Sequence, residues 1–127
     1  MLTGMRVLVA LVALFNIVMG LGFLIDPAGS ALTFYLAPLG TQGMATLRAD
    51  MTAFFLVGGG MAALGGWRVD PRPLLVPVAL LGIAIAGRAV SLIAEGAPAI
   101  AFPPMLVEAV MIAILVSARR VFAGAAR

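Results

Sequence analysis

The side chains able to do chemistry in this chain are few and of limited types. The sequence contains neither Cys nor His, and all eight of its basic residues are Arg. Disulfides, thiolate metal sites, imidazole catalysis and Schiff-base chemistry on Lys are therefore excluded. The five acids are Asp26, Asp50, Asp70, Glu95 and Glu108. Acid–base chemistry by carboxylates, oriented by Arg, is what remains, and we expect neither a metal nor a cofactor.

Four ionisable residues lie within or beside long apolar stretches: Arg48, Asp50, Arg88 and Glu108. With a rise of ~1.5 Å per helical residue, Arg88 lies ~9 Å and Glu108 ~6–15 Å below the same membrane face, with Arg48 and Asp50 just beneath it. Charges inside a membrane are costly, and two Arg can neutralise two carboxylates. We therefore predict one shared catalytic site, with Glu108 and Asp50 as the main acid–base pair and the two Arg orienting them.

A purely structural interpretation competes with this one. Arg48 can extend its long side chain to the lipid headgroups, and Asp50 can complement the dipole at a helix N-terminus. These two residues also point about 200° apart on a helix, so both cannot face one narrow site squarely. Arg88 and Glu108 are deeper, and charges at such depth are functional by default. Asn16, ~13 Å below the same face, can serve as a ligand or simply join helices by a hydrogen bond.

A substrate that reaches a site within the bilayer should itself be lipophilic, such as a terpenoid, sterol, polyketide or fatty derivative. Isomerisation, cyclisation by protonation and epoxide opening are the reactions that carboxylates and Arg can support. The residues expected to bind the substrate are Asn16, Tyr35, Ser91 and Phe54. The alternative is a non-catalytic membrane protein that binds a lipophile or assists a partner, with a structural ion-pair cluster. Of the two, we favour catalysis.

The elements that must position these residues follow from composition. Of 127 residues, 64% are hydrophobic and 10% charged, and mean hydropathy is +1.21. A soluble domain of this size cannot bury so much apolar surface. Charges bracket four apolar segments, near residues 5–25, 46–67, 73–94 and 98–119, each close to the ~20 residues that cross a bilayer. We predict an all-α, integral membrane four-helix bundle forming a single domain, 1–127.

Three segments of the chain have specific expected roles. The long connection between the first two spans contains Ala31–Leu36, predicted to be an interfacial half-helix with Tyr35 at headgroup level; whether residues 26–45 act as a lid stays open. Gly58-Gly59-Gly60 should permit close helix approach or a bend. The first span resembles a signal peptide, with a candidate cleavage site at residues 28–31, but its apolar run is too long, so we expect a retained membrane helix.

The distribution of Arg predicts the orientation. One membrane face carries six Arg, and the other carries none outside the spans; the six are Arg6, Arg68, Arg72, Arg119, Arg120 and Arg127. Positive charge favours the cytoplasmic side, so both termini of this multi-pass protein should be cytoplasmic. The expected partners are membrane lipids and a lipophilic small molecule, with homo-oligomerisation left open. Nucleic acid is not expected, because no basic run is interleaved with solvent-facing polar residues.

The stretch from Gly87 to Pro98 reads Gly-Arg-Ala-Val-Ser-Leu-Ile-Ala-Glu-Gly-Ala-Pro, and Glu108 follows within an apolar segment. This pattern, with Arg48 ahead of a Gly-rich second span, resembles the "domain of unknown function four-three-four-five" family of small bacterial four-helix membrane proteins. The resemblance covers nearly the whole chain, but Asp50-Met51-Thr52-Ala53 stands where that family has more glycine. It implies a four-helix fold in the bacterial inner (cytoplasmic) membrane, and no activity.

Overall fold

The computed structural model describes residues 1–125, and within them every regular element is helical. The elements are α1 (Leu2–Ile25), α2 (Pro27–Leu32), α3 (Gly40–Thr46), the π-helical turn η1 (Leu47–Met51), α4 (Thr52–Arg68), α5 (Leu75–Ala94), the 3₁₀ turn η2 (Ala99–Ala101) and α6 (Phe102–Ala125). Four helical stretches are long and apolar enough to cross a membrane: α1, Gly40–Arg68, α5 and Ala99–Ala125. The all-α fold class is confirmed.

The connection after α1 differs from its expected form. The half-helix was expected at Ala31–Leu36, and this position is wrong. The structure has a short helix, α2, earlier in the chain, at Pro27–Leu32. Asp26 caps it, with Oδ1 accepting a hydrogen bond from the Gly29 backbone N–H at 3.0 Å, and Pro27 suits the first helical position. The chain then turns through Tyr35 in the left-handed region (φ 58°).

The long helices extend past their expected limits, by three residues at the start of α1 (Leu2) and by six residues at each of two other places. The second begins at Gly40, six residues before the expected start, and the fourth continues to Ala125. The residues concerned form ordinary helical turns, 40–46 in α3 and 120–125 at the end of α6. The expected limits came from the positions of charged residues, which bound only the apolar part of each helix. The helical hydrogen bonding of the backbone continues beyond that part.

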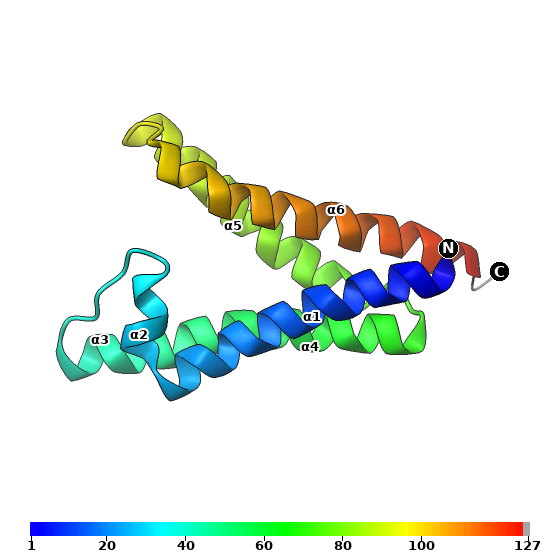
Figure 1. Cartoon of the computed structure of the whole chain (residues 1–127), viewed down its shortest axis with the longest axis horizontal. Helices are drawn as coiled ribbons and strands as arrows, with labels where there is room; N and C mark the ends of the chain where they lie inside the picture. The colour runs from blue at the N-terminus through cyan, green and yellow to red at the C-terminus, as the bar shows by residue number, and fades with distance from the viewer. Residues whose placement is uncertain (126–127) are drawn as a thin grey trace.

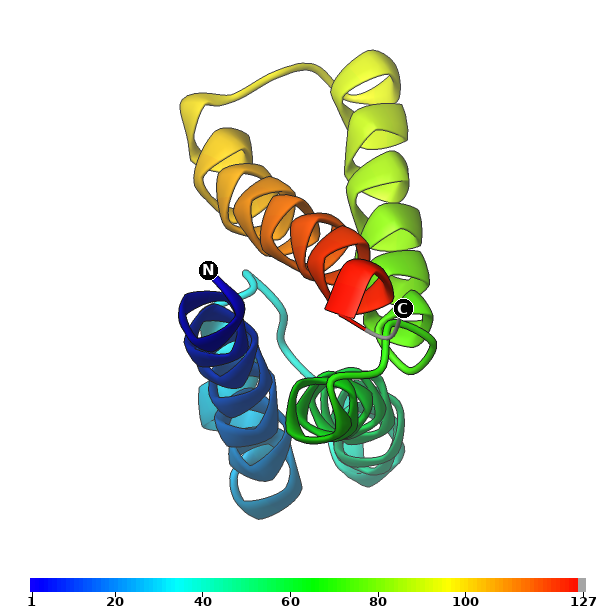
Figure 2. The same ribbon diagram turned by 90° about the vertical axis from the view of Figure 1, so that its right-hand side faces the viewer.

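The four long helices form two pairs (Figures 1 and 2). Helix α1 packs along α4, and α5 packs along α6, with further contacts of α1 with α6 and of α4 with α5. The pairs meet at the end that holds the N-terminus, the α4–α5 turn and the end of α6, here named the closed end (Figure 1). They diverge at the opposite end, the splayed end, which holds α2, α3 and the turn from α5 to η2.

Glycine explains how closely α1 and α4 pack. A Cβ at Gly59 would lie 2.8 Å from Ile17 Cγ1 and 3.0 Å from the Ala13 carbonyl oxygen. A Cβ at Gly20 would similarly lie 2.9 Å from the side chain of Leu56. Close approach of the helices, predicted for the triple-glycine stretch, is therefore seen at Gly59, whereas Gly60 has open space around it.

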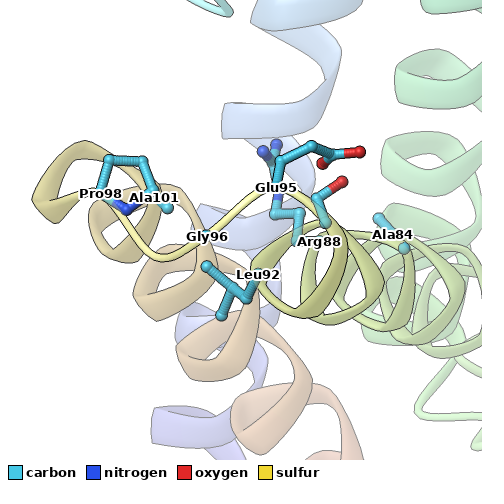
Figure 3. Close-up of a pocket in the computed structure, with 9 residues that line it drawn as sticks. Ala84, Arg88, Leu92, Glu95, Gly96, Pro98 and Ala101 are labelled. Atoms are coloured by element: carbon cyan, nitrogen blue, oxygen red, sulfur yellow. The ribbon is translucent and has the colours of Figure 1, made fainter.

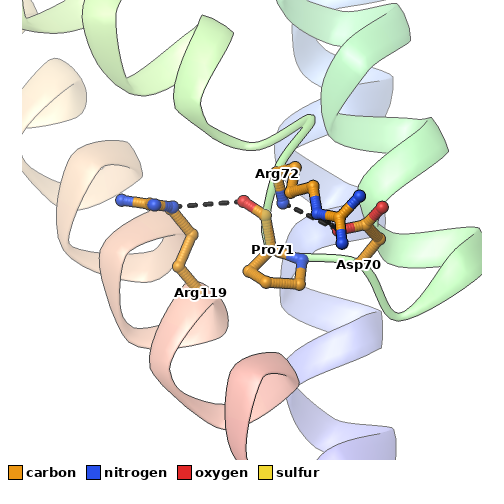
Figure 4. Close-up of polar contacts among 4 residues, drawn as sticks. All are labelled: Asp70, Pro71, Arg72 and Arg119. Carbon is orange, nitrogen blue, oxygen red and sulfur yellow. Dashed lines mark hydrogen bonds and ion pairs between the residues drawn. The ribbon is translucent and has the colours of Figure 1, made fainter. Parts of the chain in front are cut away.

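Arginine side chains fasten the closed end. Arg119 Nε, on α6, donates to the Pro71 carbonyl oxygen in the α4–α5 turn at 3.1 Å (Figure 4). Arg6 Nε, on α1, donates to the Gly66 carbonyl oxygen of α4 at 3.2 Å. Each Arg thus satisfies a backbone acceptor of a neighbouring segment near a helix end, where carbonyls lack partners within the helix. Arg127, the last of the six Arg expected at this face, lies outside the described residues.

Candidate functional site

An apolar cleft of about 860 Å³ lies between the two helix pairs. All four long helices line it, together with the segment Thr33–Tyr35 that follows α2. Its walls are mainly aromatic, aliphatic and thioether side chains, such as Phe15, Met19 and Phe54. We name this cavity the apolar cleft. Its size falls within the range of ~300–1,000 Å³ typical of small-molecule sites.

Two charged side chains, Arg88 of α5 and Glu108 of α6, meet at the wall of this cleft. Arg88 Nε donates to Glu108 Oε1 at 2.9 Å, and both residues line the cleft. The two helices run antiparallel and are joined by a turn. Arg88 lies six residues before the end of α5, and Glu108 lies six residues after the start of α6, so the two side chains lie at similar depth. The predicted pairing of Arg88 with Glu108 is therefore present in the structure.

The second oxygen of Glu108 has a different environment. Glu108 is 8% exposed, and within the described residues its Oε2 is buried without a hydrogen-bond partner. A carboxylate oxygen left in this state loses the hydrogen bonds that water would supply, which is unfavourable. Glu108, a residue that lines the apolar cleft, therefore has one strong hydrogen-bond acceptor with unused capacity.

Asn16 is buried on α1 and takes part in a helix–helix contact. Its Nδ2 donates to the Val12 carbonyl oxygen at 2.8 Å and to Met111 Sδ of α6 at 3.6 Å. Asn16 does not line the cleft, whereas Met111 does. This arrangement corresponds to the structural alternative for Asn16, in which its amide joins two helices.

Arg48 and Asp50 do not join the site, which corrects the expected four-charge cluster. Both are exposed in η1, neither lines the cleft, and Arg48 Nε donates instead to the Leu24 carbonyl oxygen at the end of α1, at 3.1 Å. The helix presents Met51 and Phe54 to the cleft, so apolar side chains take its inward positions. Arg88 and Glu108 already neutralise each other, so the cleft needs no further charges.

The other expected binding residues divide between two cavities. Tyr35 and Phe54 line the apolar cleft, and Ser91 lines a smaller cavity of about 480 Å³ that also borders Arg88. Phe34, next to Tyr35, packs against Phe23 of α1 with ring centroids 5.5 Å apart. This aromatic contact holds the segment after α2 beside the cleft.

Sequence reasoning missed several lining residues. Phe15 and Met19 on α1, and Val107 and Met111 on α6, line the apolar cleft. Each pair is four residues apart and therefore shares one helix face. That spacing is the only sequence feature that could have indicated these lining residues. Apolar residues with the same spacing also face lipid or a filled core, so only the packing of the helices shows which of them line a cavity.

The chemistry open to this site is that of one carboxylate and one guanidinium. Among residues 1–125, no three Asp or Glu side chains gather as a metal site would require. Glu108 Oε2 can accept a hydrogen bond or a proton from a molecule in the cleft. Opening an epoxide by separate acid and base groups would need a second carboxylate, and Asp50 lies outside the cleft.

No family model, curated protein or solved structure matches this chain. The resemblance to the family of bacterial four-helix membrane proteins therefore stays a prediction. The function must be inferred from the geometry of the cleft and from the distribution of charge and apolar surface around it.

Proposed function

We propose that this chain is an integral membrane protein of the bacterial cytoplasmic membrane that binds a lipophilic small molecule in its apolar cleft. Four membrane-length apolar helices support the location, as do large apolar side chains on the outside of the helices, such as Leu14, Ile83 and Leu106. Surfaces of this kind are favourable against lipid and unfavourable in water. Five of the described Arg belong to the closed end, which supports a cytoplasmic location for this end by the positive-inside rule.

The apolar walls and the unpartnered Glu108 oxygen together suggest the class of ligand. A long apolar body satisfies the walls, and one hydrogen-bond donor satisfies Glu108 Oε2. A hydroxyl group suits best, because it donates to the carboxylate and can also accept from the adjacent Arg88 guanidinium. The observation that carries the proposal is this buried, unpartnered acceptor on a residue that lines a mainly apolar cavity. Long-chain alcohols, prenols and sterols belong to this class.

Photolabelling tests the proposal. The purified protein in dodecyl maltoside micelles is labelled with a diazirine derivative of hexadecanol, and the labelled peptides are mapped by mass spectrometry. We expect label on the cleft-facing segments of α1 and α6, around Phe15–Met19 and Val107–Met111. Unlabelled hexadecanol should compete, and hexadecane should compete weakly because it has no donor. Equal competition by the two, or label spread evenly over the outer helix faces, would contradict the proposal.

A matched pair of variants isolates the carboxylate. Glu108→Gln removes the acid while keeping the side-chain shape, and Glu95→Gln removes one negative charge from the same end of the molecule outside the apolar cleft. We expect hexadecanol to bind ~10-fold more weakly to Glu108→Gln, since hydrogen bonds to charged groups contribute ~1.5 kcal/mol or more. Glu95→Gln should bind hexadecanol as the unchanged protein does.

Catalysis by proton transfer is the second candidate, and the single free oxygen of Glu108 favours one reaction class. Isomerisation needs one group that takes a proton from one carbon and returns it to another. The test incubates the protein with a β,γ-unsaturated steroid ketone and follows its conjugated product by absorbance. Turnover that is lost in Glu108→Gln, with folding intact, would support an isomerase. No turnover above buffer would leave ligand binding as the function.

A further inference from the structure

A second cavity, of about 480 Å³, borders the apolar cleft at Arg88. The last turns of α5 and the turn that leads to η2 form it, with Glu95 and Arg88 on the α5 side and Pro98 on the other (Figure 3). Its three polar side chains are Arg88, Ser91 and Glu95. They stand three and seven residues apart along α5, a spacing that puts them on one helix face. We name this cavity the polar hollow.

The polar hollow offers hydrogen-bond donors at one end. The Arg88 guanidinium has five N–H groups, and within residues 1–125 only the Nε group is recorded in a hydrogen bond, to Glu108. The Arg88 side chain is 35% exposed and lines the polar hollow. The Ser91 hydroxyl, one turn further along α5, adds another donor. Together they can hold an anionic oxygen, which a guanidinium binds well.

The other end of the polar hollow favours a cation. Glu95 is the C-cap residue of α5, is exposed, and forms no ion pair within the described residues. The C-terminus of a helix carries partial negative charge from its free carbonyl groups, which adds to the charge of Glu95. A simple anion would be repelled here, so the hollow suits a molecule that carries both signs.

We infer that the polar hollow binds the phosphoethanolamine headgroup of a phospholipid, beyond the proposed ligand of the apolar cleft. Its phosphate lies against Arg88 and Ser91, and its ammonium group lies against Glu95. The seven positions from Arg88 to Glu95 span ~10 Å of helix, which keeps the two charged ends apart. Leu92, Pro98 and Ala101 supply apolar walls beside the charges, as the glycerol and upper acyl groups of a lipid require. The inference relies on the membrane location but not on a ligand in the cleft.

Lipid titration followed by native mass spectrometry tests this inference. The full-length protein in dodecyl maltoside is titrated with phosphatidylethanolamine or with phosphatidylglycerol of identical acyl chains. We expect phosphatidylethanolamine to bind about 3- to 5-fold more tightly, the size of effect that a partly exposed ion pair produces. Glu95→Gln should abolish this preference, and Ser91→Ala should weaken both lipids equally. Equal affinities in the unchanged protein, or a preference that survives Glu95→Gln, would overturn the inference.

Two further measurements separate the sources of the headgroup and the two proposals. Soluble glycerophosphoethanolamine should displace the lipid only weakly, because it lacks the acyl groups; displacement at equal concentration would show that the headgroup alone is recognised. Val107→Trp, which places a bulky ring in the apolar cleft, should reduce hexadecanol labelling and leave the lipid preference intact. Labelling that Val107→Trp does not reduce would contradict the proposal for the apolar cleft, whereas a lipid preference that Val107→Trp abolishes would contradict the inference for the polar hollow.

Discussion

Glu108 has two different environments on one carboxyl group. Oε1 accepts a hydrogen bond from Arg88 at 2.9 Å, while Oε2 is buried among apolar side chains without a partner in the described residues. Arg88 thus supplies charge neutralisation for a side chain that lines the apolar cleft, and Oε2 keeps its hydrogen-bonding capacity unused. In the bidentate geometry, which is stronger, two guanidinium nitrogens would engage both carboxylate oxygens.

The contribution of this pair to stability can be measured by comparing a single variant with a double variant. Glu108→Ala leaves Arg88 without its partner, and we expect a loss of ~1–2 kcal/mol in the free energy of unfolding, below the full cost for a buried pair because Arg88 is about one-third exposed. The double variant Arg88→Met with Glu108→Leu should regain most of this loss, since apolar residues of similar volume replace the charges. Unfolding by SDS in mixed micelles gives both values.

The ion pair of Asp70 with Arg72 is the control for this comparison. It lies in the exposed α4–α5 turn with a 4.0 Å separation between Arg72 Nε and Asp70 Oδ1. Asp70→Asn should change stability by less than ~0.5 kcal/mol in the same experiment. A loss as large as that of Glu108→Ala would show that the micelle assay reports charge in general and not the buried pair.

Among the elements, α1 and α4 form the tightest contact of the molecule, and single glycines make it. Gly59→Ala would place a methyl group against backbone atoms of α1, which cannot move without shifting the whole helix. We expect a loss of ~1–3 kcal/mol, as overpacking of a tight contact produces. Gly60→Ala, on the next position of the same helix, meets nothing within 4 Å and should gain up to ~1 kcal/mol from helix propensity. SDS unfolding compares the two, and equal effects would contradict the packing argument.

At the scale of the whole molecule, the closed end and the splayed end differ in how they are packed. The closed end has hydrogen bonds from Arg6 and Arg119 across segments and a buried core that includes Val9, Leu115 and Phe122. The splayed end also has hydrogen bonds between segments, from Arg48 and Arg88, and a smaller buried cluster of Phe23, Ala31 and Phe55. It differs from the closed end in containing the two cavities, where the proposed ligand and lipid would bind.

The proposed orientation of these ends, with the Arg-rich closed end in the cytoplasm, can be tested directly because the chain has no native Cys. Ala97→Cys marks the turn at the splayed end, and Gly124→Cys marks the exposed end of α6 at the closed end. In intact bacterial cells, a membrane-impermeant maleimide should label Ala97→Cys and should reach Gly124→Cys only after permeabilisation. The reverse pattern would show that the closed end is outside the cytoplasm.

The amino-acid sequence alone was sufficient to predict the four long apolar helices. It was also sufficient to predict the contact of Arg88 with Glu108, from the similar depth of the two residues along neighbouring helices. Depth depends only on counting residues from a helix end, because the rise per residue is constant. Which face of a helix points inward depends instead on how the helices pack. That is why Arg48 and Asp50, at a suitable depth, lie outside the cleft, and why Asn16 joins helices beside it. The tertiary structure alone decided that two helix pairs diverge, since the tight glycine contact of α1 with α4 and the fastened closed end leave the opposite end hollow.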